Sequence, residues 1–174
     1  GKKVAVVGTG ASAVQFVPAI AAKVQQLNLF QRSAPYVIPK PDRAYSELEQ
    51  RLYAKWPVLQ QASRASIYGQ HEVRALAFTV LQAAMKPFEW QFKRHLQQAI
   101  KDPVLRAKLT PDYPLGCKRI LISNDYYPAL ARNNVNVINE GIAEVTATGI
   151  TTTTGEQYAV DTIIYQNRCK TSRL

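Results

Sequence analysis

The first part of the chain carries two short apolar runs on either side of a helical pattern. Residues 3–8 form a largely apolar run that ends in glycine, as in a strand buried on both faces of a sheet. A helical apolar pattern then continues to about Val24, with Pro18 inside it, and Leu27–Phe30 has the composition of a second strand. Strand, turn, helix and strand in this order predict a βαβ unit with parallel strands.

The middle of the chain differs in composition from its two ends. Residues 35–114 hold eight of the ten prolines and one glycine, Gly69, with helical stretches between these breakers. Within them, Phe88, Phe92, Leu96 and Ala99 follow the spacing of one helical face. A structureless loop of this length is unusual in a compact domain, so the segment predicts a helical insertion.

After Gly116 the chain returns to short segments with the composition of strands: 119–122, 136–139, 142–158 and 160–165. Ser123-Asn124-Asp125 can cap a short helix. Glycines divide 142–158 into runs that predict a small antiparallel meander, whereas 160–165 predicts one more buried strand. The remaining residues, 166–174, match no element.

These patterns together predict an α/β fold. We expect a Rossmann-like dinucleotide-binding domain with a parallel sheet, a small antiparallel β-meander and a helical insertion. This Rossmann-like domain is expected to comprise residues 1–34 plus 115–165, with 35–114 as the insertion and 166–174 as an unassigned tail.

The turn after the first strand has the residues of a dinucleotide site. Gly8 permits a tight turn, Gly10 lets a pyrophosphate approach the backbone, and Ala13 lets the helix pack on the strand. Thr9 and Ser12 lie in the same turn and are further candidates. The helix start offers unpaired N–H groups and a positive dipole end to phosphates. A glycine-containing turn is common, but its place between strand and helix favours dinucleotide binding.

The end of the second strand indicates which dinucleotide is bound. An NAD site carries Asp or Glu about 20 residues past the glycines. This chain has no acidic residue before Asp42 and carries Gln31-Arg32-Ser33 instead. A guanidinium and a hydroxyl can bind the 2′-phosphate that a carboxylate would repel, so the prediction is NADP(H). The alternative is that Arg32 is a solvated arginine at a strand end.

Charge and composition argue against several other classes of protein. The net charge is +10, but the basic residues are dispersed and no nucleic-acid recognition motif accompanies them, so no nucleic-acid partner is expected. Two cysteines, Cys117 and Cys169, and two histidines, His71 and His95, are too few for a disulfide framework or a metal site. Both histidines are expected on solvated surface.

No apolar run approaches the roughly 18 residues that a membrane span needs, and no signal-peptide pattern opens the chain. With so few cysteines, the sequence fits a reducing compartment. We therefore expect a cytoplasmic protein without a membrane span.

Several segments resemble the NADP domain of Baeyer–Villiger monooxygenases and their flavin-containing relatives. They are Gly8–Ala13, Phe30–Ser33, Tyr113–Arg119, Asp125–Tyr127 and Asp161–Tyr165. The resemblance extends over nearly the whole chain up to Tyr165. Its most specific part is the block Gly116-x-Lys118-Arg119, because dinucleotide-binding folds in general do not carry it.

The resemblance implies roles for individual residues. Arg32 and Ser33 would contact the 2′-phosphate, Lys118 would close on it from the other side, and Gln15 would lie near the pyrophosphate. Arg119 matches the family's catalytic arginine, whose guanidinium would stabilise an anionic peroxyflavin and its adduct with a carbonyl compound. The alternative is that Lys118 and Arg119 are a basic pair beside a loop.

The resemblance implies that the chain is a fragment of an NADPH- and FAD-dependent monooxygenase that oxygenates ketones or aldehydes. The family's FAD-binding glycine motif is missing, so the expected partner is the FAD-binding half of the parent enzyme. FAD is not expected on this chain, which should be inactive alone. Relatives follow the last strand with Ala-Thr-Gly, whereas this chain has Gln166-Asn167-Arg168, which suggests an out-of-frame tail.

Three alternatives remain open from the sequence. One is a fragment of an N- or S-oxygenating flavin monooxygenase. Another is a stand-alone NADP(H)-binding module, such as a redox sensor. The third is a nucleic-acid binder that uses the positive charge, whose affinity would fall steeply with salt.

Overall fold

The computed structural model describes residues 1–40, 42–80 and 86–166, with the side chains of 74–80 left out. The chain forms two compact units, which are described separately. Unit 1 comprises Gly1–Lys40 and Gln91–Leu174, and unit 2 comprises Pro41–Trp90. Cys169 and the rest of the predicted tail beyond Gln166 lie outside the described residues.

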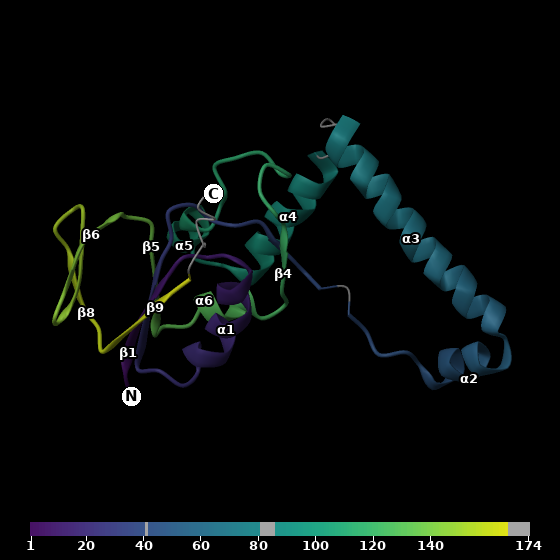
Figure 1. The fold of residues 1–174 in the computed structure, drawn as a ribbon, viewed down its shortest axis with the longest axis horizontal. Helices are drawn as coiled ribbons and strands as arrows, with labels where there is room; N and C mark the ends of the chain where they lie inside the picture. The colour runs from purple at the N-terminus through teal and green to yellow at the C-terminus, as the bar shows by residue number, and fades with distance from the viewer. Residues whose placement is uncertain (41, 81–85, 167–174) are drawn as a thin grey trace, which may run out of the picture. The chain divides into compact units, whose positions relative to one another are not determined.

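A four-stranded parallel sheet forms the centre of unit 1 (Figure 1). Its strands, in spatial order, are β5 (Val135–Ile138), β2 (Gln26–Phe30), β1 (Lys3–Val7) and β9 (Thr162–Tyr165). The helix α1 (Ala11–Ala21) connects β1 to the parallel strand β2. The predicted βαβ unit and α/β fold are therefore confirmed. The strand order, with β1 between β2 and a later strand, is that of one half of a Rossmann fold.

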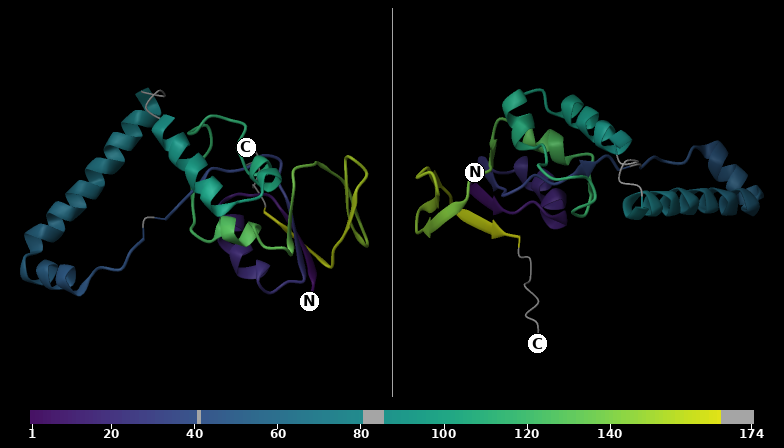
Figure 2. Two further views of the ribbon diagram at one scale, coloured as in Figure 1. Left: turned by 180° about the vertical axis from the view of Figure 1, so that it is seen from behind. Right: turned by 90° about the horizontal axis from the view of Figure 1, so that it is seen from above.

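Both faces of this sheet are covered. On one face, Ala5, Phe30 and Ile138 form a buried cluster with Ile150 of a small antiparallel sheet, and Tyr158 packs against it. That sheet is the predicted meander, with strands β6 (Ile142–Thr146), β7 (Gly149–Thr152) and β8 (Gln157–Ala159). Alternate strand residues point to the other face. There α1 packs against α6 (Tyr126–Leu130), as Figure 2 shows.

The last strand, β9, differs from the prediction for 160–165. Among the residues that the structure describes, it pairs with β1 alone and forms the edge of the sheet, and its residues are half-buried or exposed. The expectation of one more buried strand was wrong in this respect. The strand's apolar composition could not reveal its edge position, because pairing on one side or on both depends on distant segments.

Residues 35–114 are mostly helical. Their helices are α2 (Glu47–Lys55), α3 (Pro57–Val80), α4 (Lys86–Ala99) and α5 (Pro103–Lys108). The segment also contains a short strand, β3 (Val37–Ile38), which pairs in parallel with β4 (Leu121–Ile122). Phe92 and Leu96 of α4 are buried, as their helical spacing predicted. Residues 91–114 belong to unit 1 together with the parallel sheet.

Local side-chain contacts define where several helices begin. Ser46 and Glu49 form a capping box at the start of α2, and the Asp102 carboxylate accepts backbone hydrogen bonds at the start of α5. Hydrogen bonding to Arg43 lowers the pKa of Glu49 to about 2. At α6, the Ser123 hydroxyl accepts hydrogen bonds from the N–H groups of the first residues at 3.2 Å. The predicted segment does precede a short helix, but its N-cap residue, Asp125, makes no side-chain capping hydrogen bond, and Ser123 provides the acceptor from two residues earlier.

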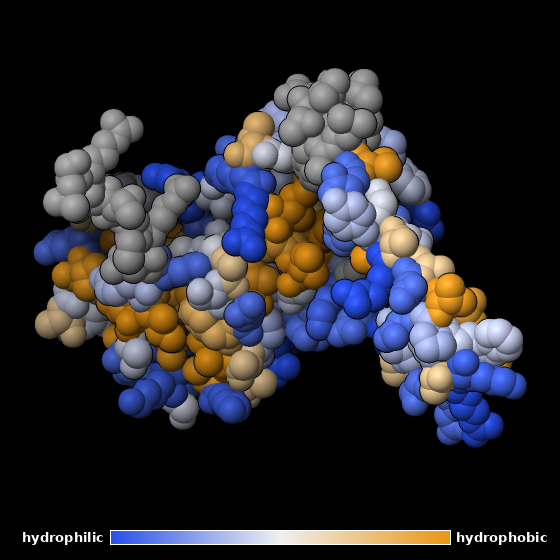
Figure 3. All heavy atoms as spheres, turned by 45° about the vertical axis from the view of Figure 1, so that its right-hand side comes forward, coloured by the Kyte–Doolittle hydropathy of each residue, from blue (hydrophilic) through white to orange (hydrophobic). Residues whose placement is uncertain are grey.

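Unit 2 leaves much apolar surface exposed. No residue of α2 is buried, and exposed apolar side chains continue along α2 and the first part of α3: Leu48, Leu52, Trp56, Val58, Leu59, Ile67, Tyr68 and Val73. Figure 3 shows apolar side chains interspersed with polar ones on the face that it presents. Apolar side chains exposed along two consecutive helices are suited to pack against another chain or domain.

His71 is exposed as predicted, whereas His95 is half-buried, 5.8 Å from the ring of Tyr127. This burial lowers the pKa of His95, so the expectation of solvated surface was wrong for it. Across the described residues, no group of three His, Cys, Asp or Glu side chains could hold a metal ion. Within the same ranges, no helix is long and apolar enough to cross a membrane.

The buried hydroxyl of Tyr126 leads to a prediction about stability. Its side chain is fully buried, and in the part of the chain that the structure describes its hydroxyl has no hydrogen-bond partner. An unsatisfied buried hydroxyl costs about 1–3 kcal/mol. We expect Tyr126→Phe to keep the ring packing and to raise the free energy of unfolding by about 1 kcal/mol in urea denaturation.

Tyr36→Phe is the matched control, because the Tyr36 hydroxyl donates to the backbone oxygen of Tyr113 at 2.8 Å. This substitution removes a formed hydrogen bond and should lower the free energy of unfolding. If Tyr126→Phe lowered the free energy of unfolding as much as Tyr36→Phe does, the Tyr126 hydroxyl would have to be hydrogen-bonded, contrary to this interpretation.

Candidate functional site

The turn that follows β1 has the geometry expected of a phosphate-binding turn. Gly8 has φ +104°, a conformation that side chains other than glycine rarely adopt, and its N–H donates to the Phe30 oxygen at 2.9 Å. Gly10 precedes the first residue of α1, and no side chain caps this helix. Ala13 is fully buried, whereas Ser12 is exposed. The buried Ala13 packs the start of α1 against the sheet, and the N-cap residue, Gly10, offers no side-chain acceptor to the N–H groups of the first turn.

This turn lies where the connections of the sheet diverge. The chain leaves β1 to reach β2 on one side, while β9 pairs with β1 on the other side. In open parallel sheets, ligands bind at the carboxyl ends of the strands at such a point, because the flanking connections run apart and leave a crevice. Gly8 and Gly10 follow the end of β1, and Gln166 follows the end of β9.

Three of the predicted binding residues come together from distant parts of unit 1. The Lys118 ammonium donates a hydrogen bond to the Ser33 hydroxyl at 2.7 Å. The Thr9 hydroxyl donates to the backbone oxygen of Ser33 at 3.4 Å. Arg32, next to Ser33, is exposed. An ammonium and a hydroxyl in contact beside an exposed guanidinium form a donor set suited to a phosphate group.

Gln31 holds the end of β2 from which Arg32 and Ser33 follow. Its side chain is buried, and its amide nitrogen donates to Asn139 Oδ1 and to the Lys108 oxygen, both at 2.9 Å. These contacts connect the ends of β2, β5 and α5. Gln31 therefore has a structural role that determines where the next two residues lie.

Tyr113 is a residue of this site to which the sequence analysis assigned no role. The Lys118 nitrogen lies 4.0 Å from the centroid of its ring, within the range of a cation–π interaction. The Tyr113 hydroxyl donates to the Ala34 oxygen at 3.0 Å, and burial raises the pKa of Tyr113. The ring is thereby fixed under the ammonium. Its position in the Tyr113–Arg119 block was the signal that could have identified it.

Two other predicted residues are exposed and stand apart from these contacts. Gln15 lies on α1, and Arg119 follows Lys118 just before β4. Among the described residues, no hydrogen bond or salt bridge joins either side chain to Ser33 or Lys118. Gly116 has φ +100° and turns the chain ahead of Lys118 and Arg119.

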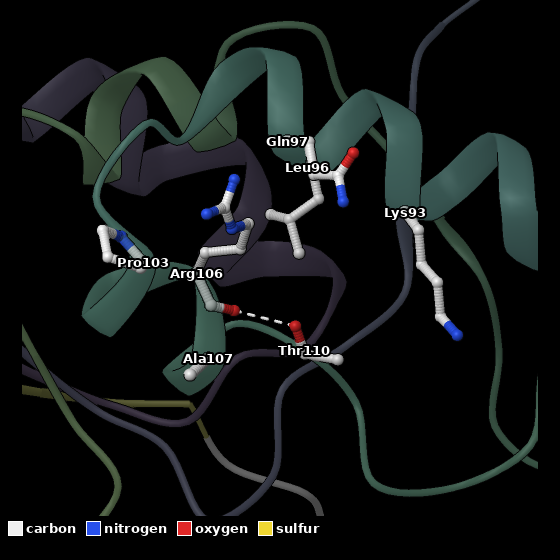
Figure 4. Close-up of a pocket in the computed structure, with 7 residues that line it drawn as sticks. All are labelled: Lys93, Leu96, Gln97, Pro103, Arg106, Ala107 and Thr110. Carbon is white, nitrogen blue, oxygen red and sulfur yellow. Dashed lines mark hydrogen bonds between the residues drawn. The ribbon is translucent and has the colours of Figure 1, made fainter.

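A separate depression of about 270 Å³ lies between α4 and α5 (Figure 4). Its lining residues are Lys93, Leu96, Gln97, Pro103, Arg106, Ala107 and Thr110. The Thr110 hydroxyl donates to the Arg106 oxygen at 2.8 Å within it. None of the predicted site residues lines this depression, so the candidate site is the turn region and not this cavity.

Comparison with known proteins identifies the chain's relatives, although no protein-family model matches the sequence. The chain is 52% identical over 165 residues to a Baeyer–Villiger monooxygenase of Pseudomonas aeruginosa and 45% identical over 165 residues to one of Streptomyces coelicolor. The chain is homologous to part of the Baeyer–Villiger monooxygenases. These matches include 95% of this chain but only 31% and 32% of the two relatives. The chain thus spans about a third of the length of the curated relatives it matches.

A solved structure supports the same assignment. An oxidized steroid monooxygenase bound to NADP superimposes on the chain with a TM-score of 0.74 and 27% sequence identity. The superposition covers 95% of this chain and 38% of that one. The resemblance to Baeyer–Villiger monooxygenases is therefore confirmed, together with the α/β fold that it implied. About two thirds of the length of each of the two curated relatives lies outside the region that this chain matches.

Proposed function

We propose that the chain is the NADP(H)-binding part of an FAD-dependent Baeyer–Villiger monooxygenase that oxygenates ketones or aldehydes. The contact between Lys118 and Ser33, beside Arg32 and close to the glycine turn, carries the proposal. This arrangement collects positive charge and hydroxyl donors where a dinucleotide with a 2′-phosphate needs them. A dinucleotide without the 2′-phosphate has no group that would contact Arg32, Ser33 and Lys118 in this way.

The cofactor-binding residues divide into two groups. The pyrophosphate would be held by the turn and the start of α1, formed by Gly8, Thr9, Gly10, Ser12, Ala13 and Gln15. The 2′-phosphate is bound by Arg32, Ser33 and Lys118. In this division, residues 1–34 and 115–165 form the binding domain and 35–114 form an insertion, part of which packs with the sheet in unit 1.

Arg119 is the proposed catalytic residue of the parent enzyme. FAD, when bound, supplies the oxygen-activating chemistry. The guanidinium of Arg119 is exposed, so it can stabilise negative charge that develops on oxygen during the attack on a carbonyl carbon. Lys118 and Arg119 are neighbours with different tasks: the first binds cofactor, and the second stabilises charge.

The parent's FAD belongs to its other part. The one glycine-rich dinucleotide motif of this chain, Gly8-x-Gly10-x-x-Ala13, is assigned to NADP(H) and leaves no corresponding motif for FAD. The exposed apolar side chains of α2 and α3 are suited to contact that other part. We therefore expect the isolated chain to be inactive. A cytoplasmic location remains our proposal from the low cysteine content.

Titration of the whole chain with each dinucleotide tests the proposed function. We expect NADP⁺ to bind roughly 10- to 100-fold more tightly than NAD⁺, because a charge-assisted contact is worth about 1.5–3 kcal/mol. Isothermal calorimetry measures both dissociation constants. The purified chain should show no flavin absorption. Equal affinities for the two dinucleotides, or a tightly bound flavin, would contradict the proposal.

A further inference from the structure

The end of β9 brings a side chain of the chain itself into the glycine turn. Gln166 follows β9, and its backbone N–H donates to the Val7 oxygen at 3.0 Å. Its side-chain oxygen accepts a hydrogen bond from the Gly10 N–H at 2.6 Å. Residue 10 is thus in contact with residue 166, at the point where the ends of β1 and β9 lie side by side.

The fit between Gln166 and the glycines is close. A Cβ atom at Gly10 would collide with the amide nitrogen of Gln166, and one at Gly8 would lie 3.3 Å from the Gln166 Cβ. The backbone dihedrals of Gly10, φ −81° and ψ −170°, are open to any residue. The atom that such a Cβ would meet is the far end of a flexible side chain, so in this structure the space beside Gly10 is filled by the Gln166 amide rather than by backbone.

The Gly10 N–H and the space beside it lie at the start of α1, which is where a Rossmann turn receives the pyrophosphate. In a Rossmann turn the second glycine lets the pyrophosphate approach the backbone at the helix start. We propose that the Gln166 side chain occupies the pyrophosphate position of this chain and competes with the cofactor for the Gly10 N–H. This inference rests on the proposed function, because it concerns the affinity of the same site.

Competition of this kind weakens cofactor binding without abolishing it. The Gln166 amide is uncharged and half-buried, and its side chain can rotate away about three single bonds. A phosphate is a charged acceptor and forms the stronger hydrogen bond to the same N–H. Cofactor therefore displaces the amide, at the cost of the hydrogen bond that Gln166 makes with Gly10. The effect falls on the pyrophosphate, which NADP(H) and NAD(H) share.

Two substitutions of Gln166 in the whole chain test this inference by calorimetric titration. We expect Gln166→Ala to bind NADP⁺ and NAD⁺ roughly 3- to 10-fold more tightly, with an unchanged ratio between them. Gln166→Glu retains an acceptor and adds a negative charge, so both affinities should fall roughly tenfold or more. The control is Gln157→Ala, which replaces an exposed glutamine on β8 and should bind both dinucleotides with wild-type affinity.

Amide hydrogen exchange provides a readout that needs no cofactor. The Gly10 amide should exchange faster in Gln166→Ala than in the wild type, because it loses its acceptor. Unchanged exchange at Gly10, or unchanged dinucleotide affinity in Gln166→Ala while the preference for NADP⁺ persists, overturns this inference and leaves the proposed function intact. If no variant binds either dinucleotide, the proposed function fails and the inference fails with it.

Discussion

Replacement of Arg119 by alanine in the intact parent enzyme should lower the rate of oxygenation by a factor of about 100 or more. A pre-placed charge that stabilises a developing oxyanion contributes to the oxygenation step itself, and its loss has effects of this size. Reduction of the flavin by NADPH should continue at the wild-type rate, since hydride transfer depends on cofactor alignment. Stopped-flow spectroscopy separates the two half-reactions.

Three further variants sharpen the test of Arg119. Arg119→Lys should recover little activity, because an ammonium lacks the planar, forked geometry of a guanidinium. Lys118→Ala should show the opposite pattern, with weaker NADPH binding and an unchanged oxygenation step. Arg132→Ala removes another exposed arginine of unit 1 and should leave both half-reactions unchanged. Wild-type oxygenation in Arg119→Ala would refute the catalytic role.

Replacement of Arg32 by alanine should remove the preference for NADP⁺ over NAD⁺. The expected loss is roughly 10- to 100-fold in NADP⁺ affinity, with little change for NAD⁺, because the guanidinium contacts only the 2′-phosphate in our proposal. Titration of the whole chain measures both values. Adenosine 2′,5′-bisphosphate, which carries the 2′-phosphate without the nicotinamide half, should lose affinity to a similar extent.

The control for Arg32 is a basic residue elsewhere in the same unit. Lys23 is exposed at the far end of α1 from the glycine turn, so Lys23→Ala should retain the wild-type preference. If Arg32→Ala lowered the affinities for NADP⁺ and NAD⁺ by the same factor, the cause would be a general electrostatic effect of the positively charged chain. That outcome would contradict the assignment of Arg32 to the 2′-phosphate.

Elements whose signals are local were predictable from the sequence. The apolar run of β1, Gly8 and the helical pattern of α1 lie next to one another in the chain, and a positive φ at Gly8 is a requirement of that turn itself. The hydrogen bonds that the Ser123 hydroxyl accepts ahead of α6 are also local. Such patterns act over a few residues, so they need no knowledge of the rest of the fold.

Contacts between distant segments were decided only by the tertiary structure. The pairing of Val37–Ile38 with Leu121–Ile122 joins two-residue strands, of which only the second lies in a segment, 119–122, whose composition predicted a strand. The edge position of β9 and the partial burial of His95 likewise depend on which segments pack beside them. Short apolar runs carry no information about the partner that covers them, and this is why these expectations needed correction.

The candidate site combines both kinds of information. The sequence by itself determined which residue types could bind a phosphorylated dinucleotide: the glycine turn, Arg32 with Ser33, and Lys118 with Arg119. Only the tertiary structure decided that Lys118 reaches Ser33 and that Gln166 reaches Gly10. These pairs are 85 and 156 residues apart. The pairing of β1 with β9 brings Gly10 and Gln166 together, whereas Lys118 reaches Ser33 from the segment that precedes β4. The residue types that can bind a phosphate are visible in short motifs, whereas the contacts between distant residues result from the packing of the whole unit.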